Sequence, residues 1–229
     1  MTEDKPDLVV EPKNPLDLDK KRGGKPYIWV SWITGLLAGT DRCYWRAWWK
    51  AHRKYAKIEQ GPEREAFLKE WTEKHDAMVQ ARAEVLKSQG YLLKVEDDGA
   101  FTLEGRTAVL SGKPDIVAIP PDSQLESIVF DQKSGKVRTS DKWQVRLYMF
   151  ALPLTWFKGK LKGVVEYRDG LHDVKPLTDA DRGHIAATIS TVGADVEPER
   201  VPSVAECKYC DIRYCPDRVT ATAGHTDSF

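Results

Sequence analysis

Two acidic residues and a lysine lie at the ends of two short apolar runs in the middle of the chain. Asp115 precedes the run 116–119, and Asp131 and Lys133 come directly after the run 128–130. Carboxylates that converge on one point repel each other unless a cation lies between them, and such hard oxygen ligands suit Mg²⁺ or Mn²⁺. A bound divalent ion can polarise a phosphate and activate water, while a lysine can neutralise the developing charge. These residues predict a metal-dependent site that hydrolyses phosphodiester bonds without a covalent intermediate.

The two apolar runs are rich in β-branched residues and therefore predict two buried strands. The segment Pro120–Ser123 between them contains two prolines and short polar residues, which favour a turn, so we expect an antiparallel hairpin. In this hairpin Asp115 can face Asp131, and the alternation of side chains along a strand puts Asp131 and Lys133 on one face. An isolated Asp-x-Lys triplet is more often an exposed ion pair beside a turn. The hairpin is the context that favours the catalytic interpretation.

A helix is expected after the hairpin, where Gln144 and Tyr148 are four residues apart and share one face. The two acids, the lysine and this Q-x-x-x-Y pattern together resemble the core of the PD-(D/E)XK nuclease superfamily, specifically its RecB-like branch. The resemblance implies that Asp115 and Asp131 ligate the metal ion and that Lys133 assists the attacking water. It also implies that Gln144 and Tyr148 position the DNA strand.

The resemblance extends to further ligands for the metal. A main-chain carbonyl near Gln132 would add one oxygen. RecB-like nucleases usually carry a glycine, a histidine and a glutamate on the helix before the catalytic strands, and the helix expected from Pro62 to Gly90 contains His75 and Glu84. No glycine precedes the histidine within this helix. Either His75 or Glu84 could complete the metal site, and the alternative for each is a solvated helix-surface residue.

Three of the four cysteines form a compact C-x2-C-x4-C pattern near the C-terminal end, at Cys207, Cys210 and Cys215. The fourth, Cys43, lies far upstream. In a reducing compartment, clustered cysteines are more often metal ligands than disulfides. Thiolates bind Zn²⁺ or an iron–sulfur cluster, and the spacing alone does not separate these two. In a zinc site His184 could replace Cys43.

One distant N-terminal cysteine and three C-terminal cysteines around such a core resemble the CRISPR-associated RecB-like iron–sulfur exonucleases and the nuclease domain of AddB-type helicase–nucleases. This second resemblance implies that a structural 4Fe–4S cluster joins the N- and C-terminal segments. Its ligands would be Cys43, Cys207, Cys210 and Cys215. It further implies a DNA exonuclease that acts on single-stranded ends or overhangs, in CRISPR adaptation with an integrase complex, or in recombination and repair with a helicase.

The segment 41–57 is expected to be a helix in which aromatic and basic residues alternate. Four of its basic residues are candidates for contacts with DNA phosphates: Arg46, Lys50, Arg53 and Lys54. Exposed basic side chains beside aromatic rings can bind single-stranded DNA without reading its sequence. The alternative is an amphipathic helix whose basic residues are only solvated. We expect its tryptophans to be buried beside the cysteines.

Length and composition predict one α/β domain over residues 27–219, between flexible tails at 1–26 and 220–229. We expect a central mixed β-sheet flanked by helices, with the restriction-endonuclease-like order αβββαβ that the resemblance implies. A strand at 163–167 and a helix at 178–191, capped by Thr178, complete it.

The 35 basic and 35 acidic residues balance, so DNA contacts must come from local patches. The absence of a long apolar run or a signal-peptide pattern predicts no membrane segment and an intracellular, cytoplasmic protein. Two other classes of function remain open. One is a catalytically weak or inactive DNA-binding module, stabilised by a cluster or by zinc. The other is a subunit that contributes an interface to a helicase or integrase complex.

Overall fold

The computed structural model describes residues 20–55, 57–58, 61–122 and 124–220. Most of the two predicted tails therefore lies outside the described residues. Within the range 1–26, however, β1 (Lys20–Lys21) is a strand that pairs antiparallel with β3 (Arg53–Lys54). Described strand structure therefore extends into the range 1–26.

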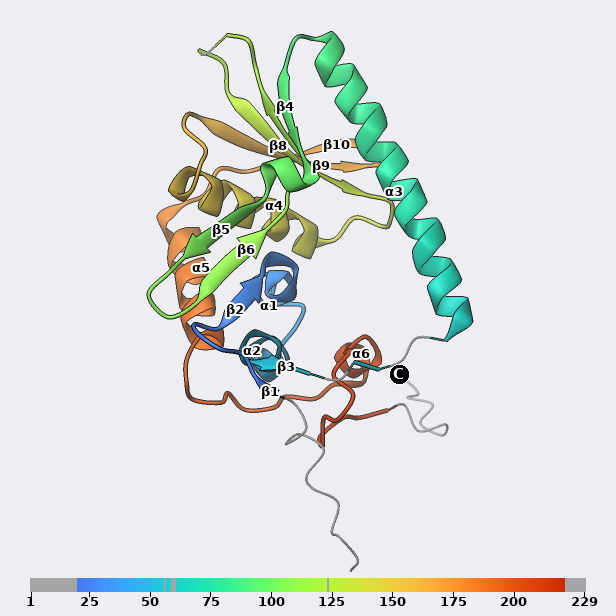
Figure 1. The fold of residues 1–229 in the computed structure, drawn as a ribbon, viewed down its shortest axis with the longest axis vertical. Helices are drawn as coiled ribbons and strands as arrows, with labels where there is room; N and C mark the ends of the chain where they lie inside the picture. The colour runs from blue at the N-terminus through green and yellow to red at the C-terminus, as the bar shows by residue number, and fades with distance from the viewer. Residues whose placement is uncertain (1–19, 56, 59–60, 123, 221–229) are drawn as a thin grey trace, which may run out of the picture.

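A five-stranded sheet forms the centre of one half of the molecule (Figure 1). Its strands are, in spatial order, β10 (Gly170–Val174), β9 (Leu161–Tyr167), β8 (Ser127–Lys133), β7 (Ile116–Ile119) and β4 (Leu92–Val95). β7 and β8 are antiparallel with Ile116 opposite Phe130, so the predicted hairpin is confirmed. β8 and β9 are parallel, whereas the other pairs are antiparallel. The sheet is therefore mixed, as predicted.

Two helices cover opposite faces of this sheet. Because parallel strands need a crossover connection, α4 (Thr139–Ala151) links β8 to β9 and packs on one face. Alternation along β8 places Val129 in the same hydrophobic cluster as Val145 of α4. The next residue, Phe130, packs with Val79 and Leu86 of α3 (Pro62–Ser88) on the other face.

The order α3, β4, β7, β8, α4, β9 gives a helix, three strands, a helix and a strand, with β5 and β6 inserted after β4. The described residues thus form an α/β fold of mixed sheets flanked by helices.

Helix α3 runs beyond the edge of the sheet that it covers (Figure 1). Its buried residues are Val79, Ala83 and Leu86, all in its C-terminal half. Every residue from 62 to 74 is exposed. At 1.5 Å per residue these thirteen residues span about 20 Å. The N-terminal half of α3 therefore contributes no buried residue to the described core.

The second half of the molecule contains a three-stranded sheet and four helices. The sheet has the order β2 (Tyr27–Trp29), β6 (Val109–Gly112), β5 (Phe101–Glu104). The helices are α1 (Thr34–Leu37), α2 (Tyr44–His52), α5 (Asp179–Val192) and α6 (Val204–Lys208). The predicted cap of α5 is confirmed, because Thr178 and Asp181 form a capping box.

The helix predicted over 41–57 is shorter than expected. α2 ends at His52 because Arg53 has extended backbone angles and pairs with Lys21 in the two-stranded sheet. Among the described residues, none of the helices combines the length and the apolar character that crossing a bilayer requires.

Candidate active site and cysteine centre

The predicted acid and lysine on β8 form an ion pair at the end of the sheet. Lys133 Nζ lies 2.7 Å from Asp131 Oδ2. The Asp131 side chain is only 1% exposed, whereas that of Lys133 is 22% exposed. Both residues point to the face covered by α4, as the alternation along the strand predicts. The pair is therefore not the surface ion pair that we considered as the alternative.

The Q-x-x-x-Y residues of α4 lie directly over this pair. Gln144 Nε2 donates to Asp131 Oδ1 at 2.8 Å and is also 2.8 Å from the hydroxyl of Tyr148. Gln144 Oε1 accepts a hydrogen bond from Lys133 Nζ at 3.3 Å. The Tyr148 hydroxyl in turn donates to the main-chain oxygen of Lys113 at 3.1 Å. One connected network thus joins α4, β8 and the segment before β7.

The second predicted acid, Asp115, lies immediately before β7 and is held from two sides. Its Oδ2 accepts a hydrogen bond of 2.6 Å from the main-chain N–H of Gln132. The same oxygen lies 3.2 Å from Nε2 of His75 on α3. The structure therefore brings His75 to the predicted acids, although its position in the helix did not match the expected pattern.

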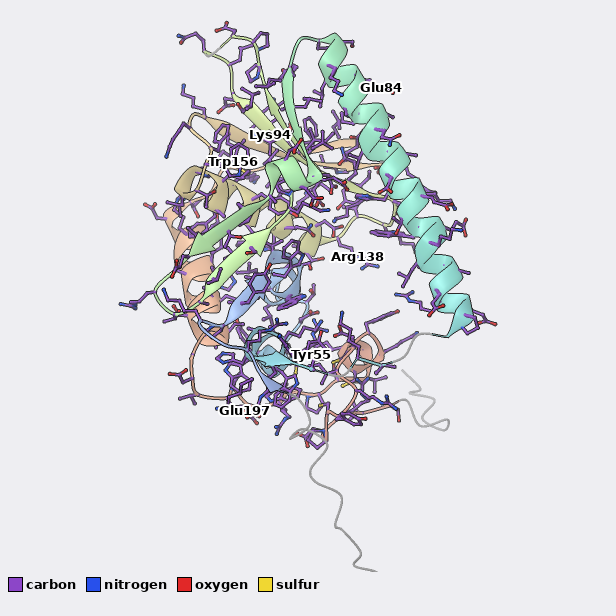
Figure 2. All side chains as sticks on the ribbon, viewed as in Figure 1. Tyr55, Glu84, Lys94, Arg138, Trp156 and Glu197 are labelled. Atoms are coloured by element: carbon purple, nitrogen blue, oxygen red, sulfur yellow. The ribbon has the colours of Figure 1, made fainter. Side chains whose placement is uncertain are left out.

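Another predicted ligand, Glu84, lies elsewhere, and the main-chain carbonyl ligand predicted near Gln132 stays a prediction. Glu84 is exposed on α3, and the nine residues that separate it from His75 correspond to about 13 Å along the helix (Figure 2). The Gln132 side chain is fully buried on the opposite face of β8 from Asp131, where its Nε2 donates to Glu166 Oε2 at 3.2 Å. Neither side chain reaches the Asp131–Lys133 pair.

An ion pair behind β8, which the sequence did not reveal, ties α3 to the sheet. Arg82 donates to both carboxylate oxygens of Glu166 on β9, at 2.9 Å and 2.5 Å. Glu166 lies opposite Gln132 in the parallel register of β8 and β9. The Arg82–Glu166 pair thus connects the helix that carries His75 to the strand beside Asp131. No local motif marks these residues, since they meet only when α3 packs on the sheet.

Two further acidic residues, Asp76 and Glu96, lie beside His75. Ligand atoms of His75, Asp76 and Glu96 all lie within 4.8 Å of one another. Glu96 has a left-handed φ of 48°, which is uncommon for a residue other than glycine, and its N–H donates to the main-chain oxygen of Asp115. No sequence pattern marks Asp76 and Glu96 as neighbours of the site, because the turn that contains Glu96 reaches His75 only in the folded chain.

Burial and charge set the protonation of the network. Burial raises the pKa of Asp131 to about 7, although Lys133 offsets part of this shift. Burial alone would lower the pKa of Lys133, but the adjacent Asp131 carboxylate raises it overall, so the amine stays charged. Burial raises the pKa of Tyr148 well above its usual value, and its hydroxyl remains a hydrogen-bond donor. The hydrogen bond to Asp115 raises the pKa of His75.

A groove lies between the start of α4 and the N-terminal helices. It has a volume of about 790 Å³, and its walls include Arg46, Lys50, Arg138 and the exposed ring of Tyr209. Of the predicted phosphate contacts, Arg46 pairs with Asp41, and Lys50 lies 2.7 Å from Asp211.

The other two predicted phosphate contacts lie outside this groove. Arg53 stacks over the ring of Trp49 with its guanidinium carbon 4.6 Å from the ring centroid, and Lys54 is exposed. The predicted phosphate contacts are therefore divided between a groove and a separate surface.

The four cysteines come together although more than 160 residues separate Cys43 from the other three. Cys43, Cys207, Cys210 and Cys215 are free thiols that line one cavity. Cys43, Cys210 and Cys215 pack beside the buried tryptophans of α2, as we expected. His184 is not part of this centre, since its Nε2 lies 3.3 Å from the main-chain oxygen of Leu37.

Hydrogen bonds to the main chain fix the two segments that carry the cysteines. Glu206 Oε1 accepts from the N–H groups of Arg42 and Cys43 at 2.9 Å and 3.1 Å, which joins α6 to the start of α2. Arg218 donates to the main-chain oxygens of Cys207, Cys210 and Ile212 at 2.6–3.0 Å. These hydrogen bonds help to hold the cysteine loop beside the start of α2.

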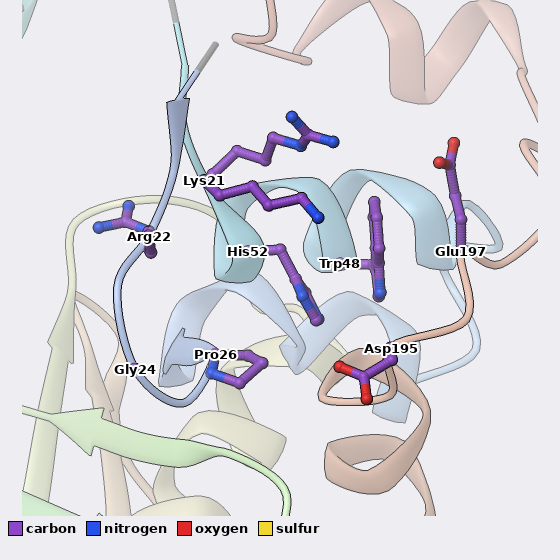
Figure 3. Close-up of a pocket in the computed structure, with 9 residues that line it drawn as sticks. Lys21, Arg22, Gly24, Pro26, Trp48, His52, Asp195 and Glu197 are labelled. Carbon is purple, nitrogen blue, oxygen red and sulfur yellow. The ribbon is translucent and has the colours of Figure 1, made fainter.

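Another cavity lies on the far side of α2 and contains none of the predicted catalytic residues (Figure 3). Its volume is about 480 Å³, and the stacked rings of Trp48 and His52 form one wall. Trp48 Nε1 donates to the main-chain oxygen of Ala194 at 2.7 Å, and His52 Nε2 lies 3.1 Å from that of Val192. These contacts attach α2 to the end of α5.

Comparison with known proteins agrees with the geometry. The model of the PD-(D/E)XK nuclease superfamily matches residues 38–216. No curated protein matches the chain. Twelve solved chains match, among them one titled "Crystal structure of SSO0001", with a TM-score of 0.47 and 17% identity over 90% of this chain and 94% of that chain. The matched family segment contains the Asp115–Asp131–Lys133 network and all four cysteines, and the chain belongs to the PD-(D/E)XK nuclease superfamily.

Proposed function

We propose that this chain is a Mg²⁺- or Mn²⁺-dependent deoxyribonuclease that removes nucleotides from single-stranded DNA ends or overhangs. The proposal rests on one observation above all. A buried carboxylate, a charged lysine and the Gln144–Tyr148 pair form one hydrogen-bonded network, and a second carboxylate and a histidine lie beside it.

The donor set suits a hard divalent ion. Asp115 and Asp131 supply carboxylate oxygens, and His75 supplies an imidazole nitrogen, which Mn²⁺ accepts. The cost of burying Asp131 supports this assignment, because a nearby cation would stabilise its ionised form. A bound ion would polarise the scissile phosphate and lower the pKa of an attacking water.

The protein groups position the remaining charges. Lys133, held by Asp131 and Gln144, would orient the water and neutralise the charge that develops on the phosphate. Gln144 keeps its amide group toward Asp131, and Tyr148 fixes that amide by its own bond to the main chain. Asp115 is oriented by the N–H of Gln132, so its second oxygen can turn toward the same point.

We assign the four cysteines to a structural 4Fe–4S cluster. Thiolates suit zinc as well as an iron–sulfur cluster, and the spacing in the sequence does not separate the two. The assignment to a cluster rests on the resemblance of the cysteine arrangement to the iron–sulfur nucleases, and all four cysteines line one cavity. Burial raises the pKa of Cys210 and Cys215, and metal binding would release their protons. A reducing cytoplasm would keep the thiols available.

The test of the hydrolytic site compares cleavage by native protein with two variants. With Mn²⁺ and an end-labelled single-stranded oligonucleotide, Asp115→Ala and Lys133→Ala should abolish degradation while the far-ultraviolet circular dichroism stays native. Leu171→Ala, which trims an exposed residue of β10, serves as the matched control and should cleave normally. Undiminished cleavage by either site variant would show that the network is not the active site.

The test of the cluster is a purification without oxygen. The native protein should absorb near roughly 400 nm and contain iron and sulfide, whereas a colourless protein with bound zinc would contradict the assignment. DNA binding without cleavage under any divalent ion would instead identify the chain as a DNA-binding module. A role beside a helicase or a CRISPR integrase complex is the pathway that the cysteine arrangement suggests, and co-purification with such a complex would test it.

A further inference from the structure

The exposed half of α3 presents aromatic rings that lead to the catalytic histidine. Phe67, Trp71 and His75 follow one another at four-residue intervals, so each ring lies about 6 Å further along the helix than the last. Phe67 is 52% exposed and Trp71 is 41% exposed. The rings of Trp71 and His75 stack with centroids 5.4 Å apart. Because His75 contacts Asp115, the row of rings ends at the predicted metal site.

Aromatic and acidic side chains of this part of α3 lie on different faces of the helix. With 100° per residue, an arc of about 120° holds these three rings together with Leu68 and the two basic residues Arg64 and Lys74. The carboxylates of the same segment all fall outside this arc, namely Glu63, Glu65, Glu70, Glu73 and Asp76. Arg64 lies over the Phe67 ring, 5.1 Å from its centroid, and Lys74 pairs with Glu70 at the border of the arc. The aromatic face therefore carries basic side chains and no acidic ones.

A groove continues this face along the C-terminal half of α3. It has a volume of about 540 Å³ and runs between α3 and the end of β9. Its walls include Lys74, Met78 and Arg82 from the same side of the helix, and Arg168 from beyond β9. The exposed Arg168 adds a positive charge to a wall that Arg82 shares with its partner Glu166. The aromatic face of α3 therefore continues beyond His75 and borders a partly basic groove.

We propose that this face of α3 is the track on which a single strand of nucleic acid stacks its bases on the way to the metal site. Aromatic rings stack on any base, which gives affinity without sequence preference, and the basic residues beside the rings attract phosphates. A ring spacing of about 6 Å is nearly twice the 3.4 Å rise per base of a duplex strand, so it suits an extended strand. The inference rests on the proposed nuclease function, for which it names the strand-binding surface.

The experiment measures binding separately from cleavage. Two labelled 20-nucleotide ligands are compared in EDTA, which prevents hydrolysis: oligo-dT and an abasic strand with the same phosphates. The native protein should bind oligo-dT more tightly than the abasic strand. Phe67→Ala and Trp71→Ala should each weaken oligo-dT binding by about fivefold, in the lower range for loss of one base-stacking ring, and leave abasic binding unchanged.

Two controls separate stacking from folding. Alanine has a higher helix propensity than phenylalanine or tryptophan, so helicity should not fall in either variant. Trp71→Phe keeps a ring and should retain most of the affinity, whereas Leu171→Ala, equal in exposure to Phe67, should bind as the native protein does.

Three outcomes would overturn the proposal. The first is native affinity for oligo-dT when Phe67→Ala and Trp71→Ala are combined in one protein. The second is an equal loss of affinity for oligo-dT and for the abasic strand. The third is that the native protein binds oligo-dT and the abasic strand with equal affinity. That result would instead favour a protein partner for this face. A protein that binds oligo-dT through these rings but never cleaves it with Mn²⁺ would refute the nuclease proposal alone.

Discussion

The affinity of the site for Mn²⁺ should depend on pH far more steeply than that of an ordinary carboxylate site. The cause is Asp131, whose burial raises its pKa from 3.8 to about 7. A cation can bind this side chain only after its proton has left, so protons and Mn²⁺ compete for it. Lowering the pH from 8 to 6 is the perturbation, and weaker binding is the expected result.

The size of the effect follows from the ionised fraction. With a pKa of about 7, Asp131 is about 91% ionised at pH 8 and about 9% ionised at pH 6. The dissociation constant for Mn²⁺ should therefore rise about tenfold over this range. A carboxyl group with the usual pKa would stay ionised throughout and leave the affinity unchanged.

Calorimetric titration with Mn²⁺ at pH 6, 7 and 8 measures this dependence, and repetition in buffers of different ionisation enthalpy counts the protons released. His75 is a second titrating group, because its raised pKa also favours the protonated, non-ligating form at pH 6. His75→Asn removes that group, and the tenfold change should persist in the variant. In Lys133→Met the pKa of Asp131 should rise further, since the lysine charge lowers it, and the profile should move to higher pH.

Equal Mn²⁺ affinity at pH 6 and pH 8 in the His75→Asn variant would refute the reasoning. It would mean that Asp131 is already ionised in the metal-free protein. The same result would weaken the argument that burial of this carboxylate prepares the site for a cation.

Three further predictions concern packing and the cysteines. Gly163→Ala should destabilise the fold by about 1–3 kcal/mol in thermal unfolding, because its Cβ would lie 2.6 Å from a sulfur of α4, whereas Gly135→Ala meets nothing within 4 Å and should be neutral. Arg82→Met should lower the free energy of unfolding by about 2 kcal/mol, because it leaves Glu166 without its charged partner. Denaturant unfolding measures this change, and an unchanged unfolding midpoint would contradict it. Cys210→Ser should lose iron and the absorbance near roughly 400 nm while α3 and the five-stranded sheet stay folded.

The hairpin of β7 and β8 could be predicted because its signals are local. β-branched runs, two prolines in the turn and side-chain alternation together specify the antiparallel pair and the shared face of Asp131 and Lys133. The four-residue spacing of Gln144 and Tyr148 likewise specifies one face of a helix. These features depend on neighbours in the sequence, so the sequence alone was sufficient for them.

The contribution of α3 could not be predicted in the same way. Which residue of a long amphipathic helix meets the site depends on how the helix docks on the sheet, and that docking is set by Arg82 with Glu166 and by the buried residues of its C-terminal half. His75 reaches Asp115 as a result, and Glu84 does not. Glu96 joins the same neighbourhood only through a left-handed turn that no residue pattern indicated.

The network around Asp131 has a consequence for the order in which the protein folds. Apart from His75, its groups come from the continuous stretch 113–148, which comprises β7, β8 and most of α4. Contacts this close in sequence cost little loop-closure entropy and form early. The cysteine centre, by contrast, needs Cys43 and the last part of the chain. A ribosome-bound chain could thus complete most of the network around Asp131 before its final cysteines have been synthesised.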